Sequence, residues 1–166
     1  MRYLVLIPAF ALAACESPSL QGVFPDLAAV NPVDVPTVPD TPAETLDPTP
    51  PPPPPPSART VEQFDTTTDQ DRQEALAVVE PAGEVTLGTT NASLGSPTDP
   101  GIWLKTPLVT SLTAGRVEYP ANGNTVNIEL RPSGGAAGSA SEISLAAMRL
   151  LEIPLTELAD VIVFAE

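Results

Sequence analysis

Apolar and polar residues alternate in short stretches through the C-terminal half of the chain, and a period of two residues is typical of half-buried β-strands. The clearest alternation runs through Val126, Ile128 and Leu130. Asn122-Gly123 lies just before it and predicts a hairpin turn after a strand at 116–119. Further strands are expected over 85–94 with a break near Gly88, in the apolar runs 102–104 and 108–112 around Pro107, and over 161–164.

Two stretches carry the signals of helices instead. Thr67 followed by Gln70 has the spacing of a capping box, so a helix is expected to have Thr67 as its N-cap and to end at Pro81. Ser144 is expected to cap a second helix, and the Gly-, Ala- and Ser-rich stretch 132–141 before it is predicted to be a loop. The apolar faces of the two helices are expected to be Ala75, Leu76, Val78 and Val79, and Leu145, Met148, Leu151 and Ile153.

The N-terminus has a different pattern, an uninterrupted apolar run. Arg2 precedes Leu4–Leu12, and small residues then lead to Cys15, the only cysteine of the chain. These are the three parts of a secretory signal. The run is too short for a membrane-spanning helix, which needs about 20 apolar residues.

Leu12-Ala13-Ala14-Cys15 resembles the lipobox of bacterial lipoproteins. The resemblance implies a signal peptide over 1–14, a diacylglycerol group with acyl chains such as palmitate on the Cys15 thiol, and a membrane anchor in the cell envelope. We expect the lipid bilayer to be a partner, at the outer membrane facing the periplasm, although Glu16 can favour the inner membrane in some bacteria. An ordinary signal peptide with an incidental Cys15 is the alternative.

Proline dominates the stretch that follows. Residues 15–60 hold most of the 22 prolines, including the run Pro50–Pro56, and their charges are all acidic until Arg59. Proline removes backbone donors and favours polyproline II, so we predict a disordered acidic tether there. A short helix and linker over 61–83 and one small α/β mixed, β-rich domain over 84–166 are expected to follow. The run Pro50–Pro56 is either a stiff spacer or a ligand for an aromatic groove.

Charge and composition exclude several functions. The formal net charge is −14, with 21 acidic and 7 basic residues, and such a surface repels the phosphates of nucleic acids. The chain has no histidine, which is the commonest metal ligand and general acid-base group. Acylation would also consume the only thiol. We therefore expect no nucleic acid partner, no metal and no cofactor.

The last third of the chain resembles the second half of the double-psi β-barrel of rare lipoprotein A. The similarity covers residues 115–165 and rests on the turn and strand Asn122–Leu130, a glycine-rich loop, Glu142–Ala147 and the closing strand. The active members of that family are lytic transglycosylases, which cut peptidoglycan. The family's loop aspartate would fall at Pro132, and its histidine has no counterpart in this chain. The resemblance therefore implies the barrel without its catalytic residues.

Some acidic residues could still form a site. Glu118 and Glu129 lie on expected strands and could face each other as the carboxylate pair of a hydrolase, or lie on the polar face of a half-exposed sheet. Glu142 is a further candidate acid, and we expect all three to face solvent. Asp99 is interpreted as part of a turn.

The other candidate residues are glycines and cations. Gly134, Gly135 and Gly138 could wrap a phosphate, but no lysine and helix start follow them, so a loop is favoured. Lys105 and Arg116 could bind a carboxylate of peptidoglycan or pair with local acids. The single Trp103 is expected in or beside the core.

The sequence thus predicts a membrane-anchored envelope lipoprotein whose domain binds peptidoglycan or a partner protein, with no catalytic residues. Absence of histidine favours binding over catalysis, which leaves enzymatic activity as the second hypothesis, in the form of a diverged glycan-cleaving enzyme. A third hypothesis is that the proline-rich tether, and not the domain, makes the interaction.

Overall fold

A computed structural model describes residues 45–77 and 83–166 of the chain. The predicted signal peptide 1–14, the predicted lipid attachment at Cys15 and the first part of the predicted tether lie outside the described residues. Val78, Val79 and Pro81, which were expected at the end of the first helix, lie outside them as well. Over the described ranges, no helix is long and apolar enough to cross a membrane.

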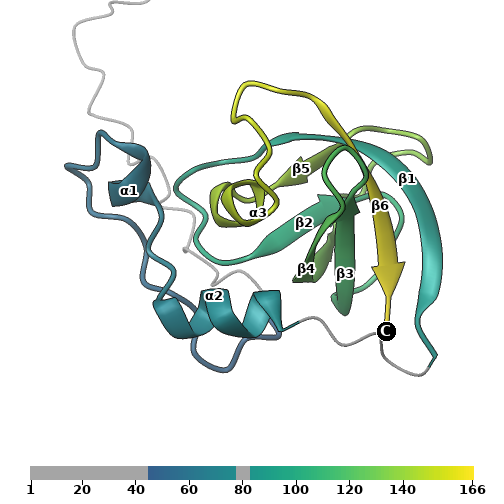
Figure 1. Cartoon of the computed structure of the whole chain (residues 1–166), viewed down its shortest axis with the longest axis horizontal. Coiled ribbons are helices and arrows are strands. Elements are labelled where there is room, and N and C mark those ends of the chain that lie inside the picture. Colours follow the sequence, from purple (N-terminus) through teal and green to yellow (C-terminus); the bar gives the residue numbers. More distant parts are fainter. Residues whose placement is uncertain (1–44, 78–82) are drawn as a thin grey trace, which may run out of the picture. The chain divides into compact units, whose positions relative to one another are not determined.

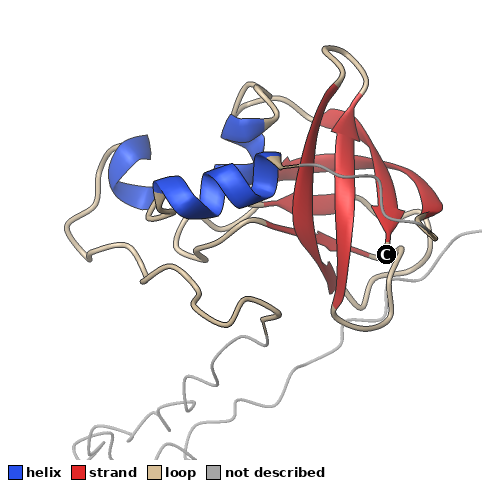
Figure 2. Cartoon of the chain, turned by 60° about the horizontal axis from the view of Figure 1, so that its bottom comes forward, coloured by secondary structure: helices blue, strands red, loops and turns tan. Residues whose placement is uncertain are grey.

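Six strands close into a mixed β-barrel, which confirms the prediction of a small β-rich domain (Figures 1 and 2). Around the barrel the strands follow the order β1-β5-β2-β4-β3-β6. Three short helices lie beside the barrel (Figure 2). The strands are β1 (Val85–Leu94), β2 (Trp103–Thr106), β3 (Thr113–Tyr119), β4 (Asn124–Pro132), β5 (Ser141–Ile143) and β6 (Ala159–Ala165), and the helices are α1 (Val61–Phe64), α2 (Asp69–Leu76) and α3 (Leu145–Leu150).

The strand pairing has an internal two-fold symmetry. β1 is parallel to β5 and β2 is parallel to β4, and all other pairs are antiparallel. Exchanging β1 with β4, β2 with β5 and β3 with β6 reproduces every pair of the barrel. The two halves of the domain, β1–β3 and β4–β6, therefore occupy equivalent places in the barrel wall.

The predicted hairpin is confirmed as β3 and β4. Val126, Ile128 and Leu130 are buried in the barrel, as their alternation predicted, while the residues between them point outwards. In the turn, Gly123 adopts a φ of 76°, a conformation that favours glycine, and the Asn124 N–H donates to the Asn122 side chain over 2.9 Å. Local turn chemistry and alternation agree here, which fixes the register.

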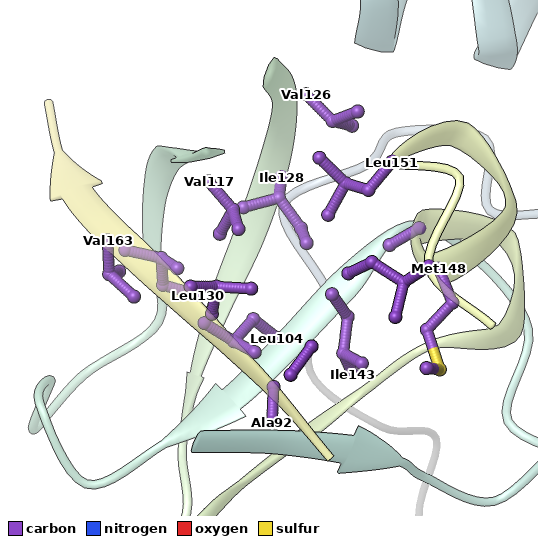
Figure 3. Close-up of a cluster of buried hydrophobic side chains, with 14 of the residues drawn as sticks. Ala92, Leu104, Val117, Val126, Ile128, Leu130, Ile143, Met148, Leu151 and Val163 are labelled. Carbon is purple, nitrogen blue, oxygen red and sulfur yellow. The ribbon is translucent and has the colours of Figure 1, made fainter. Parts of the chain in front are cut away.

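The core fills the barrel and continues under α3 (Figure 3). Leu104, Leu130 and Ile143 come from three neighbouring strands and are completely buried, and Met148 and Leu151 from the α3 segment pack on them. Ser144 caps α3 as predicted, because its Oγ accepts from the Ala147 N–H at 3.2 Å. Trp103 is 2% exposed, which confirms its expected burial.

The start of α2 differs from the prediction by one residue. Thr68 is the N-cap: its hydroxyl accepts from the Asp71 N–H at 3.1 Å, and the Asp71 carboxylate accepts from the Thr68 N–H at 2.7 Å. Thr67 cannot cap the helix because its hydroxyl already donates to Asp65 and accepts from Arg72 Nε. A capping box centred on Thr68 and Asp71 therefore replaces the one predicted for Thr67 and Gln70.

Strand boundaries also differ in three places. β1 runs through Gly88 without a break, and an irregularity in its pairing with β6 between Thr86 and Gly88 accommodates the glycine, whose φ is 125°. Residues 108–112 form no strand, although Leu108 and Val109 pack against the core. β5 was not predicted, because its three residues follow a glycine-rich loop and carry too little alternation.

The last part of the predicted tether contacts the domain, which the sequence did not indicate. Pro51 and Ala58 are buried, and the Pro52 carbonyl accepts from the Thr66 hydroxyl at 2.6 Å. At residue 45 the chain bonds directly to the barrel, where the Thr45 hydroxyl donates to Glu129 over 2.9 Å. We call residues 45–51 the strap.

Candidate functional site

A polar groove opens in the barrel wall beside β1. β5 pairs with β1 only from Ala92 onwards, so the wall between the first part of β1 and the end of β2 is not bridged by a strand. The resulting cavity has a volume of about 380 Å³, and we call it the β1 groove. Its lining residues are Thr89, Thr90, Asn91, Pro107, Leu108, Gly138, Ser139, Ala140 and Asp160.

A chain of buried hydroxyl groups runs from the β1 groove into the barrel. Thr90 Oγ1 lies 2.8 Å from Ser141 Oγ, and Ser141 Oγ donates to Thr106 Oγ1 over 2.9 Å. The Leu108 N–H also donates to Thr106, at 3.3 Å. These bonds join β1, β5 and β2 at the start of the short strand β5. They fix the relative positions of the three strands at the floor of the groove.

Asp160 is the one ionisable side chain among the residues that line the β1 groove. Its carboxylate accepts from the Asn91 side-chain amide, and within 45–77 and 83–166 no lysine or arginine forms an ion pair with it. The pair comes from the adjacent strands β1 and β6, where Asn91 and Asp160 are direct neighbours. A single carboxylate beside an amide can accept hydrogen bonds or balance a cation, but it is not the acid-base pair of a hydrolase.

A second groove, of about 370 Å³, lies between the strap, α2 and β4. Its apolar lining includes Pro51, Ala75, Ile102 and Ile128. Asp47, Asp71, Glu74 and Glu129 supply carboxylates around it. Each of these four carboxylates already accepts a hydrogen bond from the chain itself. The second groove is therefore largely a seam in which the N-terminal part of the domain meets the barrel.

Glu129 lies at the centre of an ionic cluster in that seam. Its side chain is 9% exposed and accepts from Arg131 Nε at 2.5 Å, from the Thr45 hydroxyl and from the Leu46 N–H. Arg131 also donates to both oxygens of Asp99, at 3.2 and 3.1 Å, and its guanidinium lies 5.1 Å from the centre of the Trp103 ring. All of these groups are satisfied, which indicates a structural role.

The structure does not bring Glu118 and Glu129 together. Glu129 is opposite Ala114 in the ladder, so Glu118 lies four residues further along β3, about 13 Å away at the usual rise of a strand. Both residues lie on the outer face of the sheet, as the alternative interpretation predicted. The expectation that Glu129 faces solvent is wrong, because the strap covers its carboxylate.

Lys105 and Arg116 pair with local acids. Lys105 Nζ lies 3.9 Å from Glu142, and both side chains are about half exposed. Arg116 makes a two-pronged contact with Glu84, at 2.8 and 2.6 Å, and its guanidinium stacks 4.0 Å from the centre of the Phe164 ring. The hydrogen bonds from Arg116 hold the pKa of the Glu84 carboxyl below its ordinary value of 4.5.

The glycine-rich loop is an exposed turn between β4 and β5. Gly134 and Gly138 have φ values of 68° and 84°, which explains the choice of glycine at both positions. The loop leads into strand β5 and not into a helix, so the arrangement of a phosphate-binding loop is absent from this part of the described chain. Throughout 45–77 and 83–166, no group of three or more His, Cys, Asp or Glu side chains could hold a metal ion.

Sequence reasoning missed the two residues that give the β1 groove its chemistry. Asn91 and Asp160 are 69 positions apart, and each alone looks like an ordinary polar residue at the exposed position of a strand. The weak signal was Asp160 next to the apolar run Val161–Phe164, which predicts a polar group at the start of the last strand. Comparisons of the chain with family models, curated proteins and solved structures find no match.

Proposed function

We propose that this chain is a lipid-anchored protein of the bacterial cell envelope whose barrel binds a ligand, peptidoglycan or a partner protein, without cleaving it. Leu12-Ala13-Ala14-Cys15 supports an anchor in which the Cys15 thiol is joined to diacylglycerol. A diacylglycerol group with a third, amide-linked chain holds a protein at a bilayer stably, whereas a single chain binds marginally. A place at the outer membrane, facing the periplasm, belongs to the same proposal.

The chemistry of the β1 groove carries the proposal. The loops that leave β2 and β4 both contribute to it, through Pro107, Leu108 and Gly138–Ala140. The second of these loops follows Pro132, the last residue of β4, at which the aspartate of the resembled family would fall. In this groove the one ionisable group is Asp160, which Asn91 already engages. Cleavage of a glycosidic bond requires a proton donor beside the bond, so these residues favour binding.

The symmetric strand pairing supports the double-psi barrel that the sequence resemblance implies. Such a barrel consists of two interlocked halves, and the exchange of β1–β3 with β4–β6 leaves the pairing of this barrel unchanged. Because one fold can have many functions, the barrel alone favours neither binding nor cleavage. The choice between the two therefore rests on the residues that line the β1 groove.

One observation favours the tether as an interaction element. Within the run Pro50–Pro56, Pro51 is buried while Pro52, Pro53, Pro55 and Pro56 are exposed. An aromatic groove of a partner could contact that exposed face. This second candidate predicts that replacing the exposed prolines by serine abolishes binding, and that changes in the β1 groove leave binding intact.

Co-sedimentation with purified sacculi tests the proposed function. Residues 16–166 should sediment with sacculi, and the double variant Asn91→Ala, Asp160→Asn should lose at least about tenfold in affinity, as expected for the loss of two polar contacts. Glu142→Gln, which removes an exposed carboxylate from a neighbouring strand, is the matched control and should bind normally. If the double variant binds sacculi as tightly as the wild-type protein does, the β1 groove is excluded as the binding site.

The same incubation tests for cleavage. We expect no soluble glycan fragments to be released, even over a long incubation. Release that disappears in Glu118→Gln, Glu129→Gln or Glu142→Gln would establish the glycan-cleaving enzyme instead. If the wild-type protein neither sediments nor cleaves, peptidoglycan is excluded as the ligand, and the proposal then depends on a partner protein.

A further inference from the structure

Over residues 85–91, one edge of β1 pairs with none of the described strands. β1 pairs with β6 from Val85 to Ala92, but with β5 only from Ala92 to Leu94. On the β5 side, no backbone group of residues 85–91 bonds to another described backbone group outside these ladders. Because alternate residues of a strand direct their N–H and C=O groups to opposite sides, part of this edge offers free donors and acceptors to the β1 groove.

The symmetry of the barrel identifies the equivalent edge, which is covered. β4 extends beyond β2 in the same way, because its pairing with β2 begins only at Glu129. There α2 packs on β4, and the Asn127 amide donates to the carbonyls of Glu74 and Ala77 at 3.4 and 3.3 Å. Figure 1 shows α2 beside this part of the barrel. Among the described residues, the N-terminal segment thus covers one of the two equivalent edges, while no described strand pairs with the edge of β1 at residues 85–91.

The size of the open edge limits what can pair with it. The irregularity between Thr86 and Gly88 interrupts the regular ladder, so Thr89–Asn91 remain as the straight part next to the groove. This length equals that of β5, which makes a stable three-residue pairing a little further along the same strand. A bound segment would therefore take the place that a longer β5 would have filled.

The charges of the β1 groove indicate the character of that segment. Asp160 lies next to Asn91 on the adjacent strand and has no cationic partner in the described part of the chain. The opposite wall, Pro107 and Leu108, is apolar, and no aromatic ring is among the lining residues. A basic side chain next to an apolar one on an extended backbone would match these groups, and it would suit a chain with a net charge of −14.

We propose that an extended, basic segment of a partner polypeptide adds as a strand to the free edge of β1 at Thr89–Asn91, with a lysine or arginine side chain at Asp160. Main-chain hydrogen bonds to the edge give the affinity in this mode of recognition, and side-chain pockets give the specificity. The inference rests on the proposed function and specifies the ligand of the same groove as a peptide.

Synthetic peptides test the inference on residues 16–166. The probe is a fluorescent peptide in which lysine alternates with valine and threonine, and it is compared with two variants of itself. One has proline at every second position, which removes the donors of one edge, and the other has glutamate in place of lysine. We expect binding of the first peptide only, together with about tenfold slower amide exchange in Thr89–Asn91.

Asp160→Asn should weaken binding of the lysine peptide about two- to fivefold, as expected for an exposed charge pair. The control Glu142→Gln should not change it. Equal binding of the proline peptide, or binding without protection of Thr89–Asn91, would overturn the strand pairing. If sacculi binding depends on Asn91 and Asp160 while no peptide binds, the peptide inference fails and the proposed function stands.

Discussion

At the scale of single residues, two arginines balance charges that the fold has partly buried. The side chains of Arg116 and Glu84 are 8% and 12% exposed, and they meet in a bidentate geometry over the Phe164 ring. Arg131 bridges Glu129 and Asp99 beside Trp103. A chain with only seven basic residues thus uses two of them to neutralise carboxylates at the barrel surface. Removal of either arginine would take a compensating charge away from a partly buried carboxylate.

Stability should depend on pH through Glu84. Because Arg116 lowers the pKa of this carboxyl in the folded state, its contribution to the free energy of unfolding is complete at a pH above the ordinary pKa of 4.5 that it has in the unfolded chain. It is lost as the pH falls through the lower folded-state pKa. Urea titrations should therefore show Glu84→Gln to be less stable than wild type at neutral pH, with the difference disappearing in acid. A difference of the same size at neutral pH and in strong acid, where the Glu84 carboxyl is protonated in both states, would contradict the ion pair.

Glu129 should hold the strap on the barrel. Glu129→Gln loses the charge that accepts from Thr45, Leu46 and Arg131, and we expect a loss of about 1–3 kcal/mol in the free energy of unfolding. Amide exchange at Leu46 should become faster at the same time.

Glu118→Gln is the matched control on the neighbouring strand. The Glu118 side chain is half-exposed and forms no ion pair with any residue of 45–77 or 83–166. Its replacement should change stability by at most about 0.5 kcal/mol. Unchanged exchange at Leu46 in Glu129→Gln would show that the contact does not fix the strap.

At the scale of elements, strands with strong alternation were predictable and short ones were not. β3 and β4 alternate clearly and are joined by Asn122-Gly123, so their register follows from local sequence. β2 and β5 have four and three residues, and they exist because the barrel supplies partners on both sides. Parallel pairs such as β2 with β4 cannot be recognised from local pattern, since their partners are far apart in the sequence.

Close approach of strands should make Gly115 intolerant of a side chain. A Cβ at this position would lie 2.3 Å from the Phe164 carbonyl oxygen and 2.6 Å from Leu130 Cδ1, and the first of these is backbone that pairs β3 with β6. We expect Gly115→Ala to cost about 1–3 kcal/mol of unfolding free energy, measured by urea denaturation.

Gly135→Ala is the matched control for that substitution. It lies in the exposed loop, where the nearest atoms are serine side chains at 3.3 Å that can move. Wild-type stability of Gly115→Ala would show that β3 and β6 are further apart than the structure places them.

At the scale of the whole molecule, the strand pairing of the barrel is symmetric, but the segments that pack around its two halves differ. Within the part of the chain that the structure describes, α2 covers the edge of β4 and no strand pairs with the edge of β1 at residues 85–91, although the two edges are equivalent in the barrel. The segment that makes this difference, residues 45–77, lies between the predicted anchor and the barrel in sequence. Docking of the strap at Glu129 therefore fixes where the chain leaves the domain towards its N-terminus.

Lipid attachment at Cys15 should determine whether the whole protein is held at a membrane. Labelled palmitate should enter the wild-type protein in bacterial cells and should not enter Cys15→Ala, because the chain has no other thiol. The wild-type protein should also remain in the membrane fraction after a high-salt wash, whereas the variant should be released. Equal labelling of both proteins would contradict the lipobox interpretation.

Elements with local signals could be predicted from the amino-acid sequence. Alternation and turn chemistry gave the β3–β4 hairpin, Ser144 gave the start of α3, and the final apolar run gave β6, because neighbouring residues alone decide these features. Composition likewise excludes imidazole chemistry whatever the fold, because the chain contains no histidine. The capping box of α2 was misplaced by one residue because Asp65 and Arg72 occupy the Thr67 hydroxyl, a competition that spacing does not reveal.

The candidate site could not be predicted from the sequence, because its residues come together only in the folded barrel. Asn91 and Asp160 meet because β1 and β6 pair, and the β1 groove exists because β5 is too short to cover the edge of β1. Glu129 became a docking point because a proline-rich segment, which the sequence assigned to a free tether, folds back on the barrel. Each of these features depends on contacts between residues far apart in the chain. Burial of apolar surface drives closure of the barrel and so brings these residues together. Because the hydrophobic effect is not directional, the apolar pattern of the sequence does not indicate which polar groups become neighbours.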